Sequence, residues 1–169
     1  MIEASPIALF TCRVEPQWVD NNGHMNVAYY AQVFDQALEG FFDLVNLGQH
    51  HRETFGAAMF VVENHFTYQS ELRMGEEISI RLQLLDRDRK RIHCFMELIK
   101  AGESNPSATS EQIAVYVDLK TRKSLSIPTA PMATLSAYLE AHRRIARPKE
   151  VGHKIGIRRR RNPAFSIAG

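Results

Sequence analysis

The stretch WVDNNGHMN, residues 18–26, holds the polar side chains that are best placed to do chemistry. Asp20 stands in it ahead of a turn rich in asparagine and glycine, and an apolar helix is expected to begin just after Asn26. The first amides of a helix have no partner inside it. A carboxylate beside them can act as nucleophile or general base, while the free N–H groups polarise a carbonyl and hold an oxyanion. The same residues could simply build a turn, and the spacing alone leaves both interpretations open.

A second pair of reactive side chains, Glu63 and His65, lies in the stretch VVENHFTYQ. On a strand, residues i and i+2 point to the same face, so the pair is expected to share a face with Met59 and Val61. A carboxylate beside an imidazole suits acid–base work in a pocket. An ion pair on an outer sheet face is the alternative, and the pattern does not decide between the two.

Other kinds of catalytic site receive less support from the sequence. His50 and His51 are adjacent, so their side chains would diverge on a helix or a strand, and no other spacing demands a metal. The sequence contains neither a glycine-rich phosphate loop nor a Gly-x-Ser-x-Gly nucleophile turn. We therefore expect neither a bound metal nor a cofactor.

The hydrophobic pattern predicts the elements that would position these groups. Apolar residues recur at helical spacing from Val27 to Val45, which predicts a helix of about 20 residues that begins after an Asn26 cap. Period-two and β-branched stretches predict strands at 10–19, 57–69, 77–87, 91–100 and 109–121, and a shorter helix is expected near 132–144. One long helix followed by successive strands with short turns implies an α+β arrangement, in which an antiparallel sheet covers the helix.

Composition is that of an ordinary globular protein. The 169 residues suit one domain, with 44% apolar and 24% charged residues, and no apolar run is long enough to span a bilayer. The N-terminus lacks a basic region followed by a long apolar run, so no signal peptide is expected. Cys12 and Cys94 lie in apolar, strand-like contexts and are expected to be buried free thiols, which suits a reducing compartment. We expect a cytoplasmic protein without a membrane partner.

Basic charge gathers at the C-terminal end of the chain. Residues 154–169 hold Lys154 and the arginines at 158–161 and no acidic side chain, so the rest of the chain is net acidic under a total charge of +2. An arginine run can bind nucleic acid, pair with an acidic partner surface or hold a substrate phosphate. No recognition helix or stacking platform accompanies it, so nucleic acid is the less expected partner. We assign residues 1–146 to the folded domain and 147–169 to a basic tail.

The stretch VDNNGHMNVAYYAQVFDQA resembles the signature of the 4-hydroxybenzoyl-CoA thioesterase-like family, and the order of the predicted elements resembles its hotdog fold. The downstream stretch VVENHFTYQSELRMGEEI is also similar to that family. Its Glu-x-His-x-x-Tyr form resembles the branch that contains betainyl-CoA thioesterase. The resemblance covers roughly residues 10–122. It implies a five-stranded antiparallel sheet wrapped around a long central helix, and an enzyme that hydrolyses an acyl-CoA thioester to free CoA and a carboxylic acid.

The resemblance also implies roles for individual residues. Asp20 matches the family's catalytic aspartate, which acts as nucleophile or as general base for water, and a backbone N–H at the helix start polarises the thioester carbonyl. The implied substrate and oxyanion region comprises Gly23, His24, Met25, Asn26, Tyr29, Glu63 and His65. Some hotdog thioesterases instead use a carboxylate within the central helix, but Asp35, Glu39 and Asp43 lie off the apolar stripe of this one. The candidates for binding CoA phosphates are Arg73, Arg87, Arg89, Lys90 and Arg91, together with the tail arginines.

The family further implies an assembly. Such proteins form homodimers with their sheets joined edge to edge, often pair again into tetramers, and bind acyl-CoA at the subunit interface. Two alternatives are open, namely an acyl-CoA hydratase or dehydratase on the same fold, and a non-catalytic module that binds acyl-CoA or nucleic acid. The acyl group is open too. Tyr29, Tyr30 and Phe34 on the central helix suit an aryl group or, through cation–π contact, a cationic one such as betaine, and they are equally plausible core residues.

Overall fold

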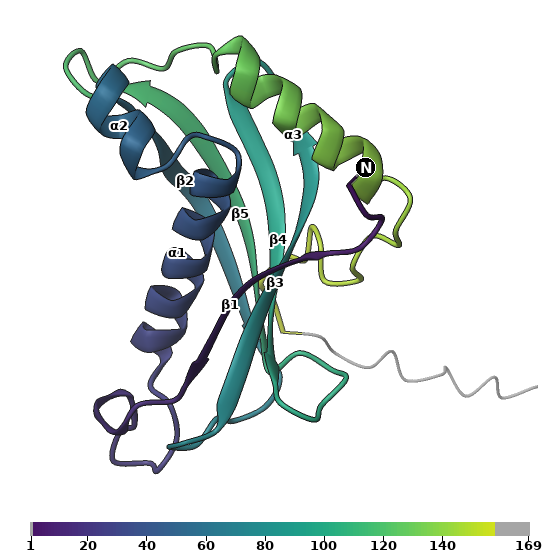
Figure 1. The fold of residues 1–169 in the computed structure, drawn as a ribbon. Coiled ribbons are helices and arrows are strands. Elements are labelled where there is room, and N and C mark those ends of the chain that lie inside the picture. The colour runs from purple at the N-terminus through teal and green to yellow at the C-terminus, as the bar shows by residue number, and fades with distance from the viewer. Residues whose placement is uncertain (1, 158–169) are drawn as a thin grey trace, which may run out of the picture.

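The computed structural model describes residues 2–157 and shows one curved antiparallel sheet with a long helix along one face (Figure 1). The strands are β1 (Ile7–Arg13), β2 (Ala57–Tyr68), β3 (Glu77–Arg87), β4 (Arg91–Lys100) and β5 (Ala108–Asp118). They lie in the order β1-β3-β4-β5-β2, so β1 and β2 form the edges. The predicted five-stranded α+β sheet around a long helix is confirmed. The arginines at 158–161 lie outside the described residues.

The long helix α1 (Val27–Leu44) begins where the sequence predicts. Asn26 caps it, because its Oδ1 accepts a hydrogen bond from the Ala28 N–H at 3.0 Å. The buried face of α1 follows the apolar stripe and consists of Tyr30, Val33, Phe34, Ala37, Leu38, Phe41 and Phe42. These side chains fill the space between α1 and the sheet and form the centre of the hydrophobic core.

The C-terminal end of α1 differs from the prediction. The helix ends at Leu44, and a second short helix, α2 (Gln49–Phe55), follows. Asn46 takes a left-handed conformation with φ of 58°, which breaks the helical path. Asp43 then caps α2, since its Oδ1 accepts from the Gln49 N–H at 3.1 Å. The tight approach of this loop leaves no room for a Cβ at Gly48, which would stand 1.8 Å from the Asp43 carboxylate.

The first strand is shorter and earlier than the predicted 10–19. After β1, residues Pro16–Trp18 form one 3-10 turn, η1, which Pro16 begins. Proline has no N–H to donate to a neighbouring strand, so it favours leaving the sheet here. Trp18 is 5% exposed and stacks on Tyr29 of α1, with ring centroids 5.9 Å apart. This contact fixes the chain against α1 just before the polar turn.

A β-bulge changes which residues of β2 face α1. The ladder between β2 and β5 shifts register between Val61 and Glu63. Met59 packs in the core before the bulge, and Phe66 packs against the core after it. Glu63 and His65 therefore lie on the outer face, away from α1, and do not share the face of Met59. The predicted facing was wrong because one extra residue inverts the alternation.

The second long helix, α3 (Thr129–His142), covers the part of β3 that β1 does not reach (Figure 1). The ladder from β1 ends at Leu82. Beyond it, the Leu84 N–H donates to Nδ1 of His142 at 2.8 Å, so a side chain replaces the missing strand. The chain then crosses the outer face of the sheet, where the Gly152 N–H donates to Oε2 of Glu111 at 2.7 Å. Part of the predicted tail thus lies against the sheet.

The cysteines and the helices bear on two further expectations. Both cysteines are free, as predicted, although Cys12 is only partly buried. Burial raises the pKa of the Cys94 thiol to about 12, so this sulfur is a core atom rather than a nucleophile. In the described part of the chain, no helix is both long and apolar enough to cross a membrane.

Candidate functional site

Hydrogen bonds within the Asp20 turn give the turn its shape. The Asp20 N–H donates to the His24 carbonyl at 3.1 Å, and the Gly23 N–H donates to the Asp20 carbonyl at 3.0 Å. Gly23 has φ of 81°, a left-handed conformation that glycine adopts without strain. The result is a closed loop that returns the chain to the start of α1.

Two backbone hydrogen bonds and one buried side chain anchor this loop. The Met25 N–H donates to the Leu72 carbonyl at 2.7 Å, and the Asn26 N–H donates to the Trp18 carbonyl at 2.8 Å. Met25 is 2% exposed and belongs to the core. The polar residues of the loop are therefore held in place by its apolar ends.

The Asp20 carboxylate is held at the N-terminus of α1. Its Oδ1 accepts from the Asn22 N–H at 2.8 Å, and its Oδ2 accepts from Nδ2 of Asn26 at 3.3 Å. The Asn22 hydrogen bond is the main cause that lowers the pKa of Asp20 below its ordinary value. Burial has the second-largest effect and opposes it, while the Asn26 amide and the nearby His24 lower the pKa further. Asn26 thus caps the helix and orients an ionised carboxylate with one side chain.

A cavity of about 290 Å³ opens beside this turn. It is lined by His24, Met25, Val27, Tyr30, Tyr68, Gln69, Ser70 and Glu71. Tyr30 and Tyr68 meet edge to face, with ring centroids 5.2 Å apart. Burial raises the pKa of Tyr30 to about 12, so its hydroxyl stays neutral. The cavity combines aromatic walls, the Glu71 carboxylate and Val27, the first residue of α1, whose N–H has no acceptor within the helix. Asp20 is not among its lining residues.

The structure gathers most of the predicted site at this turn and leaves two residues elsewhere. Asp20, Gly23, His24, Met25, Asn26 and Tyr29 all lie in the turn or the first turn of α1. His65 lies on the outer face opposite Glu111, and its ring is 6.0 Å from that of His153. Glu63 is exposed at the bulge.

A role for Glu63 and His65 in substrate binding stays a prediction, and a substitution tests it. From their outer-face position we expect Glu63→Gln to keep turnover within about twofold of the unchanged protein, since surface substitutions usually have small effects. Turnover and acyl-chain preference, measured side by side, decide the matter. A change in chain preference with an intact fold would show that Glu63 contacts the substrate.

The predicted CoA-binding residues separate into two groups. Arg73 follows Leu72, the residue that anchors the Asp20 turn. Arg87, Arg89, Lys90 and Arg91 lie at the other end of β3, whose 11 residues span about 35 Å. Local partners hold three of them: Arg87 donates to Ser136, Lys90 to Ser124, and Arg91 pairs with Asp88. Among the candidates within residues 2–157, only Arg73 adjoins the residue that anchors the Asp20 turn.

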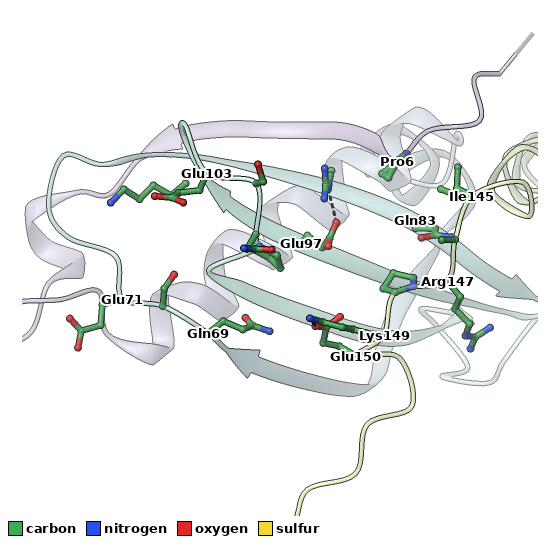
Figure 2. Close-up of a pocket in the computed structure, with 18 residues that line it drawn as sticks. Pro6, Gln69, Glu71, Gln83, Glu97, Glu103, Ile145, Arg147, Lys149 and Glu150 are labelled. Carbon is green, nitrogen blue, oxygen red and sulfur yellow. Dashed lines mark hydrogen bonds and ion pairs between the residues drawn. The ribbon is translucent and has the colours of Figure 1, made fainter.

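A larger cavity of about 850 Å³ lies on the outer face of the sheet, beneath the C-terminal segment (Figure 2). Its basic side chains are Arg81, Lys100, Arg147 and Lys149, and its acidic ones are Glu71, Glu97, Glu103 and Glu150. Residues 69–71, just after β2, line both this cavity and the smaller one beside Asp20. The two spaces therefore meet at one loop.

The sequence did not reveal several of these lining residues. Glu71 stands in no recognisable motif, and the place of Tyr68 depends on how β2 is registered against β5. The sequence predicts a tail for Arg147 and Lys149, and the return of the chain across the sheet brings them to the cavity. The Tyr that ends the Glu-x-His-x-x-Tyr stretch was the one available signal for Tyr68.

Comparison with known sequences places this geometry among related proteins. Residues 14–138 match the model of the Thioesterase-like superfamily. The betainyl-CoA thioesterase of Pseudomonas aeruginosa is 35% identical over 144 residues, which cover 85% of this chain and 91% of that protein. The L-carnitine dehydrogenase/betainyl-CoA thioesterase of Rhizobium meliloti is 32% identical over 156 residues, 92% of this chain. The match spans only 31% of that longer protein.

Solved structures extend the likeness. A Staphylococcus aureus protein determined in complex with CoA has a TM-score of 0.84 at 29% identity, over 90% of this chain and 97% of that one. A 1,4-dihydroxy-2-naphthoyl-CoA thioesterase from Synechocystis has a TM-score of 0.67 at 19% identity, over 78% of this chain and 96% of that one. The second likeness bears on the fold alone.

Proposed function

Because the chain belongs to the thioesterase-like superfamily, we propose that it is an acyl-CoA thioesterase in which Asp20 carries the chemistry. The predicted family and hotdog fold are confirmed by the same matches. One observation carries the catalytic proposal: Asn26 caps α1 and, with the same side chain, holds the Asp20 carboxylate at the helix N-terminus. A nucleophile or base and an oxyanion site are thereby fixed relative to each other.

The proposed reaction follows from that arrangement. The thioester carbonyl oxygen docks against the N–H of Val27, the first residue of α1, because the Ala28 N–H is already bonded to the Asn26 cap. Asp20 either attacks the carbonyl carbon, giving an acyl–aspartate that water then hydrolyses, or removes a proton from an attacking water. The C–S bond breaks and CoA leaves as the thiolate, which takes up the proton that the water releases. The amide and the helix dipole stabilise the tetrahedral oxyanion.

A thiol-trapping dye with a panel of acyl-CoA esters tests this function. We expect at least one ester to release free CoA at a rate that depends on the amount of protein. A hydratase or dehydratase would change the acyl chain without releasing thiol. A module that binds acyl-CoA or nucleic acid would retain its ligand unchanged, and nucleic-acid binding would weaken with salt and with removal of residues 154–169.

The cavity beside the Asp20 turn, lined by His24, Met25 and Val27, supports a short cationic acyl group. The Tyr30 and Tyr68 rings present aromatic surface, which attracts quaternary ammonium groups, and Glu71 adds a negative charge. The relative from Pseudomonas aeruginosa is named a betainyl-CoA thioesterase. We therefore expect betainyl-CoA to be hydrolysed faster than tert-butylacetyl-CoA, which has the same shape without the charge. An equal rate for the two esters would show that the cavity does not recognise the positive charge of the acyl group.

We also propose a homodimer joined at β2. This edge strand exposes Val61 and Val62, at 40% and 61%, and an exposed apolar edge favours pairing with another strand. Antiparallel pairing of two β2 strands would set the β3–β4 turn of the second copy on the same side as the Asp20 turn of the first. That turn carries most of the predicted CoA-binding residues. A tetramer would need a further contact, and mass measurement in solution distinguishes the two assemblies.

A cytoplasmic location is the remaining part of the proposal. The free state of Cys12 and Cys94 supports it, because reducing compartments keep thiols unpaired. Detection of the chain in the membrane or secreted fraction of its source cell would contradict it.

Hydrolysis is expected to stay constant from neutral pH down to about pH 4 and to fall only below that. The pKa of Asp20 is lowered from its ordinary value of about 3.9, so the carboxylate keeps its charge over this range. A lowered folded-state pKa also contributes stability above the unfolded-state value, and that contribution is lost as pH falls through the folded pKa. A profile of kcat/KM with circular dichroism at each pH checks this. A midpoint between pH 5 and 7 with an intact fold would show that another group limits the reaction.

A further inference from the structure

Two separate cavities lie in line along the space between α1 and β2, one beside the Asp20 turn and one toward the middle of the helix. Together they are called the groove. Its first part is the cavity beside Tyr30 and Tyr68, and its second part is a cavity of about 340 Å³. The second part is lined by Ala31, Gln32, Asp35, Val61, Asn64, Phe66 and Gln112. Positions 27, 31 and 35 follow one ridge of α1, and positions 68, 66 and 64 alternate to one face of β2. Asp35 therefore lies about 12 Å along the helix from Val27.

The floor of the second cavity is polar, although this face of the sheet is otherwise apolar. Gln112 of β5 is 3% exposed, and its Nε2 donates to Ser110 Oγ at 2.8 Å. Ser110 Oγ in turn donates to Asn64 Oδ1 at 2.9 Å. Oε1 of Gln112 has no hydrogen-bond partner among residues 2–157, although the atom is buried. A buried acceptor without a partner is rare in proteins and unfavourable, so it suits a site that a hydrogen-bond donor enters.

The charge of this cavity points to the same kind of ligand. Asp35 brings a carboxylate, and within the described part of the chain it forms no ion pair. No basic side chain lines the cavity. Phe66 supplies an apolar wall between the Asp20 turn and Gln112, and Val61 supplies one beyond Gln112. A chain with an apolar middle and a cationic or hydrogen-bond-donating end complements this arrangement.

We propose that the groove holds the acyl chain, and that Asp35 and Gln112 select acyl groups whose far end carries a hydroxyl or an ammonium. This inference rests on the proposed thioesterase function, with the carbonyl at the Val27 N–H. A short cationic acyl group ends between Tyr30 and Tyr68, whereas a longer acyl chain reaches Asp35. Asp35 and Gln112 are specificity-determining residues at a distance from the bond that breaks.

Three CoA esters of matched length test the proposal: 8-aminooctanoyl-CoA, 8-hydroxyoctanoyl-CoA and nonanoyl-CoA. The amino ester is expected to exceed the nonanoyl ester in kcat/KM by about tenfold or more, since hydrogen bonds between charged groups are among the stronger ones. Asp35→Asn is expected to reduce that ratio to about threefold or less. Glu39→Gln, one turn further along α1 in an ion pair with Arg52, is the matched control and is expected to keep the ratio.

A second variant guards against an effect on folding. Gln112→Leu is expected to abolish the preference for the hydroxyl ester while the thermal midpoint stays level or rises, because the unpaired acceptor is removed. The inference is overturned if the unchanged protein hydrolyses nonanoyl-CoA as fast as the amino ester or faster. It is also overturned if Asp35→Asn leaves the ratio of kcat/KM between these two esters unchanged. In both cases thiol is still released, so the proposed function stands. Release of no thiol from any ester overturns the function and this inference together.

Discussion

Asp20→Asn is expected to lower kcat by about a thousandfold or more and to leave the fold intact. Asparagine has the same shape, so its Oδ1 still accepts from the Asn22 N–H, and only the weak contact of 3.3 Å to Asn26 is lost. The amide can neither attack a thioester nor take a proton from water, and loss of such a group removes most of the catalysis. Thiol release under saturating substrate measures kcat, and circular dichroism with thermal unfolding measures the fold.

Asp118→Asn is a matched control for this change. Asp118 also accepts a backbone N–H, from Thr121, and that contact lowers the pKa of its carboxyl. It lies at the far end of β5 from the Asp20 turn, so turnover is expected to stay close to that of the unchanged protein. Near-normal turnover in a folded Asp20→Asn protein would show that Asp20 takes no part in the reaction.

Val27→Pro is expected to lower kcat by about a hundredfold to a thousandfold, the effect of deleting one oxyanion donor. Proline is tolerated at the first position of a helix, because the N–H it lacks has no acceptor there. Asn26, the preceding residue, has φ of −69° and ψ of 144°, the extended conformation that a residue before proline prefers. The substitution therefore deletes one N–H with little cost to α1, and the rate of thiol release measures the loss.

Val27→Ala keeps the N–H and trims the side chain, so it separates the two effects. Both variants change the apolar side chain that Val27 gives to the cavity beside the Asp20 turn, so KM is expected to change in both. Only the proline variant is expected to lose kcat. Equal kcat values for the two variants, with equal helix content in the far-ultraviolet, would show that another donor holds the oxyanion.

The start of α1 and the turn before it could be predicted because their signals are local. The apolar spacing, the Asn26 cap and the glycine at position 23 all act within a few residues of one another. The end of α1 could not be predicted in the same way. It depends on Asn46 in a left-handed conformation and on Asp43 turning back to cap α2, and a continuous apolar pattern conceals both.

The remaining parts of the site depend on contacts between distant strands. Alternation along β2 predicts facing only while the phase is constant, and the bulge after Val61 inverts it for Glu63 and His65. Gln112 reaches the groove through the pairing of β5 with β2, which no pattern in either strand specifies. Charge alone could not show which basic residues bind CoA. Most of them lie at the end of β3 that is far from Asp20.

The double contact of Asn26 has a consequence for anyone who tries to make this protein more stable. Judged as a helix cap, Asn26 is interchangeable with aspartate, which caps about equally well. In this position, however, Asn26→Asp would face the Asp20 carboxylate with a second one, where Asn26 now donates a hydrogen bond. Repulsion between the two carboxylates would raise the pKa of Asp20. The pH below which activity is lost would then be higher. A substitution that is neutral on the scale of helix propensity would therefore narrow the pH range in which the protein can work.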